Sequence, residues 1–349
     1  MNDIELIEKL CSAPGAPGFE DEVVGIARLF TEENGFARCR ENSLRNLYLD
    51  RKENSGEKPV VMIDAHADEV GFMVKLIHAN GCLSFLELGS ISGEKIQGQR
   101  VLVRNAEGRY VPGLVTSKPP HYAGGNQEIY IDVGATSREE AISGFGMRIG
   151  EPAVPASSFS YDSAKGLIFT KALDCRIGCA ALLWTLKELA NEVLAVDIVG
   201  TLTSQEEVGT RGSAAAARAI APRAAIVLEG APADDTFLEP GSAQTALKKG
   251  PMLRHMDKSM ISNPRFTRLT LSIAGDRGIA VQEAVRDGGG TNGGPVHLSG
   301  DGVPTIVISV PVRHSHSPCG IAYLGDFRGT VELLKAILRS LNEEVISGF

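Results

Sequence analysis

From about Gly166 onward, apolar runs of strand length alternate with amphipathic runs of helix length. Strands that alternate with helices favour a mainly parallel sheet covered by helices, because parallel strands need a long crossover connection. The sequence therefore predicts an α/β layer architecture. The expected strands are GLIFTKAL, AVDIVGTLTS, RAAIVLEG and GVPTIVISVPV, and the expected helices are RIGCAALLWTLKELANE, TRGSAAAARAIAP, RGIAVQEAVRD and LGDFRGTVELLKAILRSLNEEV.

The segment from about Val70 to Tyr161 has a different texture. Short strand-like runs such as RVLVRN, RYVPGLVT and EIYIDVG follow one another there, with Gly and Pro at close intervals. The α/β stretch before this segment is too short to stand alone. We therefore expect residues 70–161 to be a small β-rich domain inserted into one discontinuous α/β domain, formed by residues 1–69 and 162–349.

Composition narrows the class of protein. The chain has 349 residues, of which 43% are hydrophobic, and its net charge is −8, which disfavours a nucleic-acid partner. No apolar run approaches the roughly 20 residues that span a bilayer, and the amino terminus lacks a signal-peptide pattern. The six cysteines are scattered, which is typical of reduced thiols. We expect a soluble cytoplasmic protein without a membrane partner.

Two adjacent glutamates, Glu206 and Glu207, follow the apolar run AVDIVGTLTS. Neighbouring carboxylates at the end of a buried strand repel each other and resist desolvation, so something must compensate them. A metal ion could do so if one glutamate binds it and the other faces its bound water. The alternative is a solvated loop, which the apolar strand just before them disfavours.

Candidate ligands also lie at three places outside this pair and at a fourth near the last predicted strand. His66 and Asp68 lie two residues apart on a strand, so Asp68 could orient the imidazole; the alternative is a satisfied histidine at a strand end. Asp174 lies between a strand and a helix, where it could equally be a helix cap. Glu229 ends another apolar run and could be a solvated side chain.

His314 and His316 follow the last predicted strand, and each could also be a solvated polar group. The joint arrangement is more informative than any single residue. The carboxyl ends of parallel strands converge on one edge of a sheet. Two histidines with several carboxylates at one edge are a ligand set for two zinc-type ions that share a bridging carboxylate.

The chain resembles the M42 family of metallo-aminopeptidases, which includes glutamyl aminopeptidases and the tetrahedral TET peptidases. The resemblance rests on motifs in their order along nearly the whole chain: SAPGAPGFEDEV, DAHADEVGFMV, LTSQEEVGTRGS, GGGTNGGPVHLSGDGVP and GVPTIVISVPVRHSHSP. It implies an exopeptidase-type three-layer α/β/α domain with an inserted PDZ-like domain. It also implies a homo-oligomer, with a tetrahedral dodecamer as the expected assembly.

The resemblance also implies roles for the candidate residues. Asp174 would bridge two divalent ions, zinc or cobalt with manganese as an alternative. One ion would also be held by His66 and Glu229, and the other by Glu207 and His316. His316 is preferred to His314 because the family ligand immediately precedes Ser-Pro.

The implied activity is removal of amino-terminal residues from short peptides through a hydroxide that bridges the ions. Glu206 would be the general base and Asp68 would orient His66. This chain departs from the family pattern at three positions near the site. Cys175 replaces the usual Asp or Asn, Glu229 stands where many relatives have Asp, and His314 stands where the family often has Tyr. Two alternatives stay open, namely a catalytically weakened assembly protein and a hydrolase of another amide or a glucan.

Overall fold

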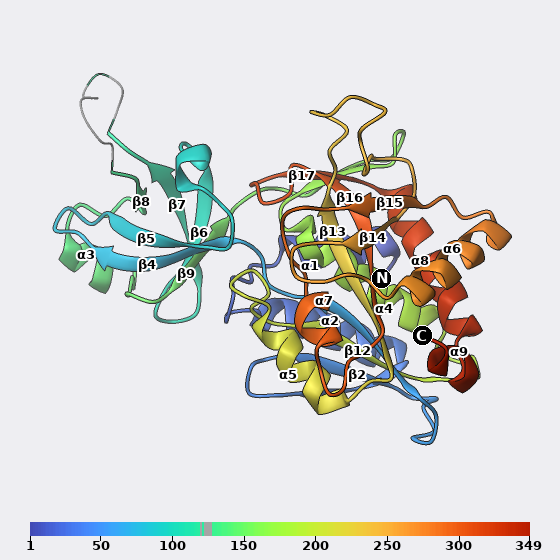
Figure 1. Ribbon diagram of the computed structural model, residues 1–349. Coiled ribbons are helices and arrows are strands. Elements are labelled where there is room, and N and C mark those ends of the chain that lie inside the picture. Colours follow the sequence, from blue (N-terminus) through green and yellow to red (C-terminus); the bar gives the residue numbers. More distant parts are fainter. Residues whose placement is uncertain (119–120, 122–127) are drawn as a thin grey trace.

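The computed structural model describes residues 1–118, 121 and 128–349, which form two bodies (Figure 1). The larger body combines a β-sheet with helices, and the smaller body consists mainly of strands. The chain leaves the larger body after β3 (Val60–His66) and returns to it at β10 (Ser160–Asp162), ahead of α4 (Leu173–Glu188). The smaller body is therefore an insertion into the larger one, as the sequence predicts.

The larger body is built on a central sheet of eleven strands among the described residues. Besides β3, these strands are β1 (Ala37–Glu41), β2 (Leu47–Arg51), β10 (Ser160–Asp162), β11 (Leu167–Thr170), β12 (Asp197–Thr203), β13 (Ala224–Pro232), β14 (Met252–Met256), β15 (Gln282–Val285), β16 (Thr305–Arg313) and β17 (Gly320–Tyr323).

The strand order is β1-β2-β12-β3-β13-β16-β17-β11-β10, with β14 paired to β16 and β15 to β14. The four central strands β12, β3, β13 and β16 pair in parallel, whereas β1, β2, β17, β11 and β10 pair antiparallel with their neighbours. The sheet is therefore mixed, and the parallel arrangement that the sequence predicts lies at its centre. Thr203 pairs with His66, so β12 and β3 end level with each other.

Helices cover both faces of this sheet. Alternate residues of the buried strand β3 explain why: Val61, Ile63 and Ala65 pack into the large apolar core under α1, α2, α4, α6 and α8, whereas Met62 packs on the other face with α5 and α7. The remaining helices are α1 (Asp3–Ser12), α2 (Asp21–Asn34), α5 (Arg211–Ile220), α6 (Pro264–Arg277), α7 (Gly293–His297), α8 (Leu324–Ser340) and α9 (Glu343–Ser347).

The expected helix at RGIAVQEAVRD is wrong. In the structure α6 ends at Arg277, the first residue of this segment, and the strand β15 lies inside the segment. Helix α6 begins at a side-chain cap, because Asn263 accepts hydrogen bonds from the backbone N–H groups of Arg265 and Phe266, and Pro264 occupies the first turn. The apolar residues after α6 have helical spacing, but pairing with β14 fixes them as an edge strand.

The inserted body is a closed antiparallel barrel with the strand order β4-β5-β8-β7-β6-β9. Its apolar interior includes Phe72, Val101 and Ile131. All six strands lie inside the predicted insertion 70–161, whose boundaries stay a prediction. The barrel consists of β4 (Gly71–Ile77), β5 (Leu83–Leu88), β6 (Arg100–Arg104), β7 (Tyr110–Thr116), β8 (Tyr130–Asp132) and β9 (Pro152–Pro155), with η1 (Gly93–Ile96) and α3 (Arg138–Ser143) beside them.

Within the residues that the structure describes, no helix combines the length and the apolar character that a membrane span requires. All six cysteines are free thiols, and Cys11, Cys175 and Cys179 are buried.

Candidate metal centre

The predicted site residues come together at the carboxyl edge of the parallel strands. Six of them line one open cavity of about 510 Å³, namely His66, Asp174, Glu206, Glu207, Glu229 and His316, whereas Asp68 lies outside its wall. His66 is the last residue of β3, and Glu206 and Glu207 lie in the loop after β12, which ends at Thr203. His316 lies in the loop after β16, and Glu229 lies within β13, three residues before that strand ends. Asp174 completes the set from the first turn of α4, where its backbone departs from helical geometry.

Asp174 stands between the two histidines. Its Oδ1 lies 3.2 Å from His66 Nε2, and its Oδ2 lies 3.1 Å from His316 Nε2. Ser315, which sequence reasoning missed, donates a further hydrogen bond from its hydroxyl to Oδ2 at 2.9 Å. Both carboxylate oxygens of Asp174 thus face an imidazole, and the N-cap position of α4 is held by Ala172 and not by Asp174.

The glutamates sort into two groups around these histidines. His66 Nε2 lies 3.6 Å from Glu229 Oε2 and 4.0 Å from Glu206 Oε2, and His316 Nε2 lies 3.6 Å from Glu207 Oε1. Among the described residues, donor atoms close enough to share an ion are found in the groups Asp174–Glu207–His316, His66–Glu206–Glu207 and His66–Cys175–Glu229. His314 belongs to none of these three groups.

Burial and crowding shift the acidity of these side chains. Burial raises the pKa of Glu207 to about 8, and the charge of Asp174 adds to this effect. Burial also raises the pKa of Glu206 well above its ordinary value. Burial opposes the protonation of His316, but the hydrogen bond to Asp174 and the charges of Asp174 and Glu207 outweigh it and raise the pKa of His316 to about 9. Divalent cations would supply the positive charge that these protons provide, so metal binding and proton release are linked.

Asp68 makes contacts beyond the predicted one. Asp68 lies just beyond the end of β3 and not on the strand as predicted, and His66 Nδ1 lies 3.2 Å from its backbone carbonyl and 3.4 Å from its Oδ1. The same carboxylate accepts hydrogen bonds from the backbone N–H of Glu206 at 2.9 Å and of Glu207 at 3.0 Å. Asp68 is fully buried. It therefore ties the loop that carries both glutamates to the strand that carries His66.

A buried ionic group beside Asp174 was missed from the sequence. Lys171 Nζ lies 2.5 Å from Glu69 Oε1, and Arg176 donates to the backbone carbonyls of Leu10 and Ala13. All three charged side chains are buried. Glu69, Lys171 and Arg176 are charged residues next to apolar strand or helix residues, and this pattern could have indicated them. They anchor both sides of the α4 turn to the amino-terminal segment.

A second buried network fixes the glycine-rich loop that lines the cavity. Asp64 accepts hydrogen bonds from the hydroxyls of Thr201 (2.6 Å) and Thr203 (3.0 Å) and from Asn292 Nδ2 (2.7 Å). Asn292 follows the cavity residues 288–291. The network therefore joins this loop to β3 and β12, two residues below His66 on β3.

Substitution of Asp64 by Ala is expected to lower the free energy of unfolding by about 2–3 kcal/mol, because it leaves buried hydroxyl and amide donors without an acceptor. Urea unfolding in the presence of a chelator measures this effect without a contribution from metal binding. The exposed Asp276 on α6 supplies the matched control, and its replacement by Ala is expected to change stability by less than about 0.5 kcal/mol. Equal effects of the two variants would contradict this account.

A mixed β-sheet covered by helices, with imidazole and carboxylate side chains at one edge and an inserted barrel, is compatible with the class of metal-dependent exopeptidases. The chain belongs to the M42 family, because the family model described as M42 glutamyl aminopeptidase matches residues 46–333. The chain is therefore an M42 aminopeptidase, and the family's metal dependence accords with the donor set found here.

Individual relatives agree with this assignment. The lysyl aminopeptidase of Pyrococcus furiosus is 32% identical over 98% of both chains. The TET aminopeptidase of a marine-sediment Thaumarchaeota archaeon has a solved structure that matches with a TM-score of 0.94 at 34% identity, covering 99% of this chain and 98% of that one. The Pyrococcus horikoshii TET1 peptidase matches with a TM-score of 0.86 at 29% identity, over 97% of this chain and 100% of that one, and can assemble into a tetrahedron or a large octahedral shell.

Proposed function

We propose that this chain is an aminopeptidase with two metal ions that removes amino-terminal residues from short peptides. The observation that carries the proposal is the position of Asp174, whose two oxygens each face a different histidine. One ion would be held by His66, Asp174 and Glu229, and the other by Asp174, Glu207 and His316. Nitrogen and oxygen donors of this kind suit zinc or cobalt, with manganese as an alternative.

Ions bound here would lower the pKa of a water molecule and polarise the substrate carbonyl. Glu206 is assigned the proton transfers. It lines the cavity, and its carboxylate lies farther from His66 than that of Glu229 does. Burial raises the pKa of Glu206. A carboxylate with a raised pKa is a stronger base, which suits a group that takes a proton from the attacking water and returns it to the departing amine. Asp68 holds Glu206 in place through the backbone.

The cavity also favours substrates with a free amino terminus. Its wall carries the carboxylate of Asp287, which is not among the residues assigned to the ions or to proton transfer. A free α-amino group is positively charged and can pair with such a carboxylate, whereas an internal peptide nitrogen cannot. Peptide substrates should therefore enter with the amino terminus first.

A peptide library assayed after reconstitution with zinc, cobalt or manganese tests the reaction. Acidic, basic and apolar first residues should all be represented, since the family model is a glutamyl aminopeptidase and one relative is a lysyl aminopeptidase. Each peptide should be paired with its amino-terminally acetylated form. Release of the first residue from the free peptides alone supports the proposal, and cleavage of the acetylated forms would contradict it.

Removal of divalent ions with a chelator is expected to abolish this activity, and zinc or cobalt should restore it, because the reactive water and the carbonyl would no longer be activated. Residue release is measured before chelation, after it and after each metal is returned. Chelator-insensitive peptide release would argue against a metal-dependent reaction. Chelator-insensitive cleavage of a β-glucan would instead support the glycan-hydrolase alternative.

Solved relatives form dodecamers and tetrahedral or octahedral shells. For this chain we propose a homo-oligomer, with a tetrahedral dodecamer as the assembly, in the cytoplasm. Light scattering coupled to gel filtration should then give twelve times the mass of the chain, and a monomer at micromolar concentration would contradict the assembly. A dodecamer that binds fewer than two ions and leaves every peptide intact would favour the weakened assembly protein.

A further inference from the structure

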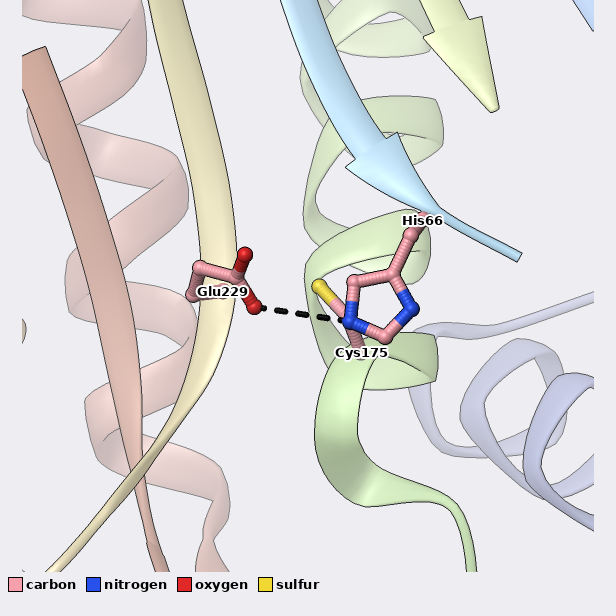
Figure 2. Close-up of side chains that lie close together, drawn as sticks. All are labelled: His66, Cys175 and Glu229. Atoms are coloured by element: carbon pink, nitrogen blue, oxygen red, sulfur yellow. Dashed lines mark ion pairs between the residues drawn. The ribbon is translucent and has the colours of Figure 1, made fainter. Parts of the chain in front are cut away.

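A thiol lies at one end of the candidate metal centre. Cys175 comes from the first turn of α4, His66 from the end of β3 and Glu229 from β13. Their donor atoms all lie within 4.8 Å of one another, and all three side chains are buried. Figure 2 shows the sulfur directed into the space between the imidazole and the carboxylate. We propose that Cys175 is a sulfur ligand of the ion that His66 and Glu229 hold, an inference that rests on the proposed two-ion site.

The surroundings of Cys175 hold its sulfur in this position. The thiol donates a hydrogen bond to the carbonyl of Leu228 at 3.1 Å, and Leu228 immediately precedes Glu229 on β13. Gly178 lies next to the sulfur on α4, and a Cβ at this position would lie 2.5 Å from Sγ. Any larger residue at position 178 would therefore have to displace the thiol. The missing side chain at Gly178 thus leaves the space that the sulfur occupies.

Glu229 supplies a second observation that points to a cation. Its carboxylate is buried, and its ion-pair partner is His66 Nε2 at 3.6 Å, which is longer than an ordinary hydrogen bond. A buried carboxylate is costly unless a close donor or a metal compensates it. A divalent ion between Glu229, His66 and Cys175 would provide this compensation.

Metal binding would replace the proton on the sulfur of Cys175. Binding breaks the S–H bond of Cys175, forms a bond between sulfur and the ion, and releases one proton to solvent, with no change of oxidation state. Zinc lies about 2.3 Å from sulfur and about 2.0–2.2 Å from nitrogen and oxygen ligands, so donor atoms that lie within 4.8 Å of one another could meet one ion after drawing closer together. Thiolate favours zinc and cobalt over manganese, which prefers oxygen donors. The His66 end should therefore discriminate against manganese more strongly than the His316 end.

Cobalt provides a direct readout of the sulfur ligand. Metal-free protein titrated with cobalt chloride alone should develop the near-ultraviolet charge-transfer absorption of a cobalt–thiolate bond. Cys175→Ser should lose this band. Cys179→Ser is the matched control and should keep it, because Cys179 lies one turn further along α4, is equally buried and donates to the carbonyl of His66 at 3.0 Å. Loss of the band in the Cys179 variant alone would overturn the proposal.

Metal competition gives a second readout. Cys175→Ser should lower the ratio of zinc to manganese affinity by at least about 10-fold, since even partners outside the ligand shell change affinity by this amount. X-ray absorption of the zinc-loaded wild-type protein requires no variant and should show a sulfur neighbour at about 2.3 Å.

These measurements separate the two proposals. A wild-type protein that cleaves peptides but shows neither the cobalt band nor a sulfur neighbour overturns the role of Cys175 and leaves the aminopeptidase intact. A protein that shows both signals but cleaves no peptide overturns the proposed function and leaves Cys175 as a ligand.

Discussion

Replacement of Glu206 by Gln is expected to lower kcat by about 100- to 10,000-fold, the range over which a general acid–base group contributes. The substitution keeps the shape of the side chain but removes its ability to take up a proton. Glu206 lines the cavity. Its position is fixed by its backbone N–H, which donates a hydrogen bond to Asp68, and this bond does not involve the Glu206 carboxylate. The loop should therefore keep its position, and both ions should remain bound.

The neighbouring residue provides the matched control. Glu207 Oε1 lies 3.6 Å from His316 Nε2 and shares a ligand group with Asp174, so Glu207→Gln should weaken metal binding. Measurement of kcat together with the metal content per chain distinguishes the two variants. If Glu206→Gln lost an ion and Glu207→Gln kept both, the assigned roles of the two glutamates would be reversed.

The gathering of the site could be predicted because it depends on topology. His66 ends one apolar strand, Glu207 and His316 lie after two others, and the carboxyl ends of parallel strands share one edge. The structure places these strands at the centre of the sheet, in the parallel part. The five candidate ligands could therefore be assigned to one edge of the sheet before any distance was known, namely His66, Asp174, Glu207, Glu229 and His316.

The edge of the sheet could not be predicted in the same way. Strand β15 is four residues long and has one buried residue, Ala284, so its apolar pattern carries little information. Pairing with β14 decides its conformation, and that contact joins segments whose proximity no local pattern reveals. Helix α6 was also missed from the sequence, although Asn263 and Pro264 are a recognisable helix start.

The second role of Asp68 shows a related limit. The spacing of His66 and Asp68 on one strand predicts a contact between their side chains. The hydrogen bonds from the backbone of Glu206 and Glu207 to Asp68 cross 138 and 139 positions of sequence. Backbone donors carry no residue-type signal, so only the folded chain reveals them.

Replacement of Asp174 by Asn should have the largest effect on metal binding. An amide has one oxygen in place of two and carries no charge, so it cannot face both histidines as an acceptor. The structure places Asp174 Oδ1 3.2 Å from His66 and Oδ2 3.1 Å from His316. At least one ion should bind more than about 100-fold more weakly, which exceeds the effect of losing a partner outside the ligand shell.

Zinc titration calorimetry on metal-free protein measures this loss for each ion, and peptide release should fall together with occupancy. Ser315→Ala is the matched control, because it removes only the hydroxyl that donates to Asp174 Oδ2 at 2.9 Å and leaves both carboxylate oxygens in place. We expect that variant to retain two ions with affinities reduced by about 10-fold or less. Two tightly bound ions in the Asp174→Asn protein would show that Asp174 is not shared, because a bridge cannot lose one of its two charged oxygens and hold both ions unchanged.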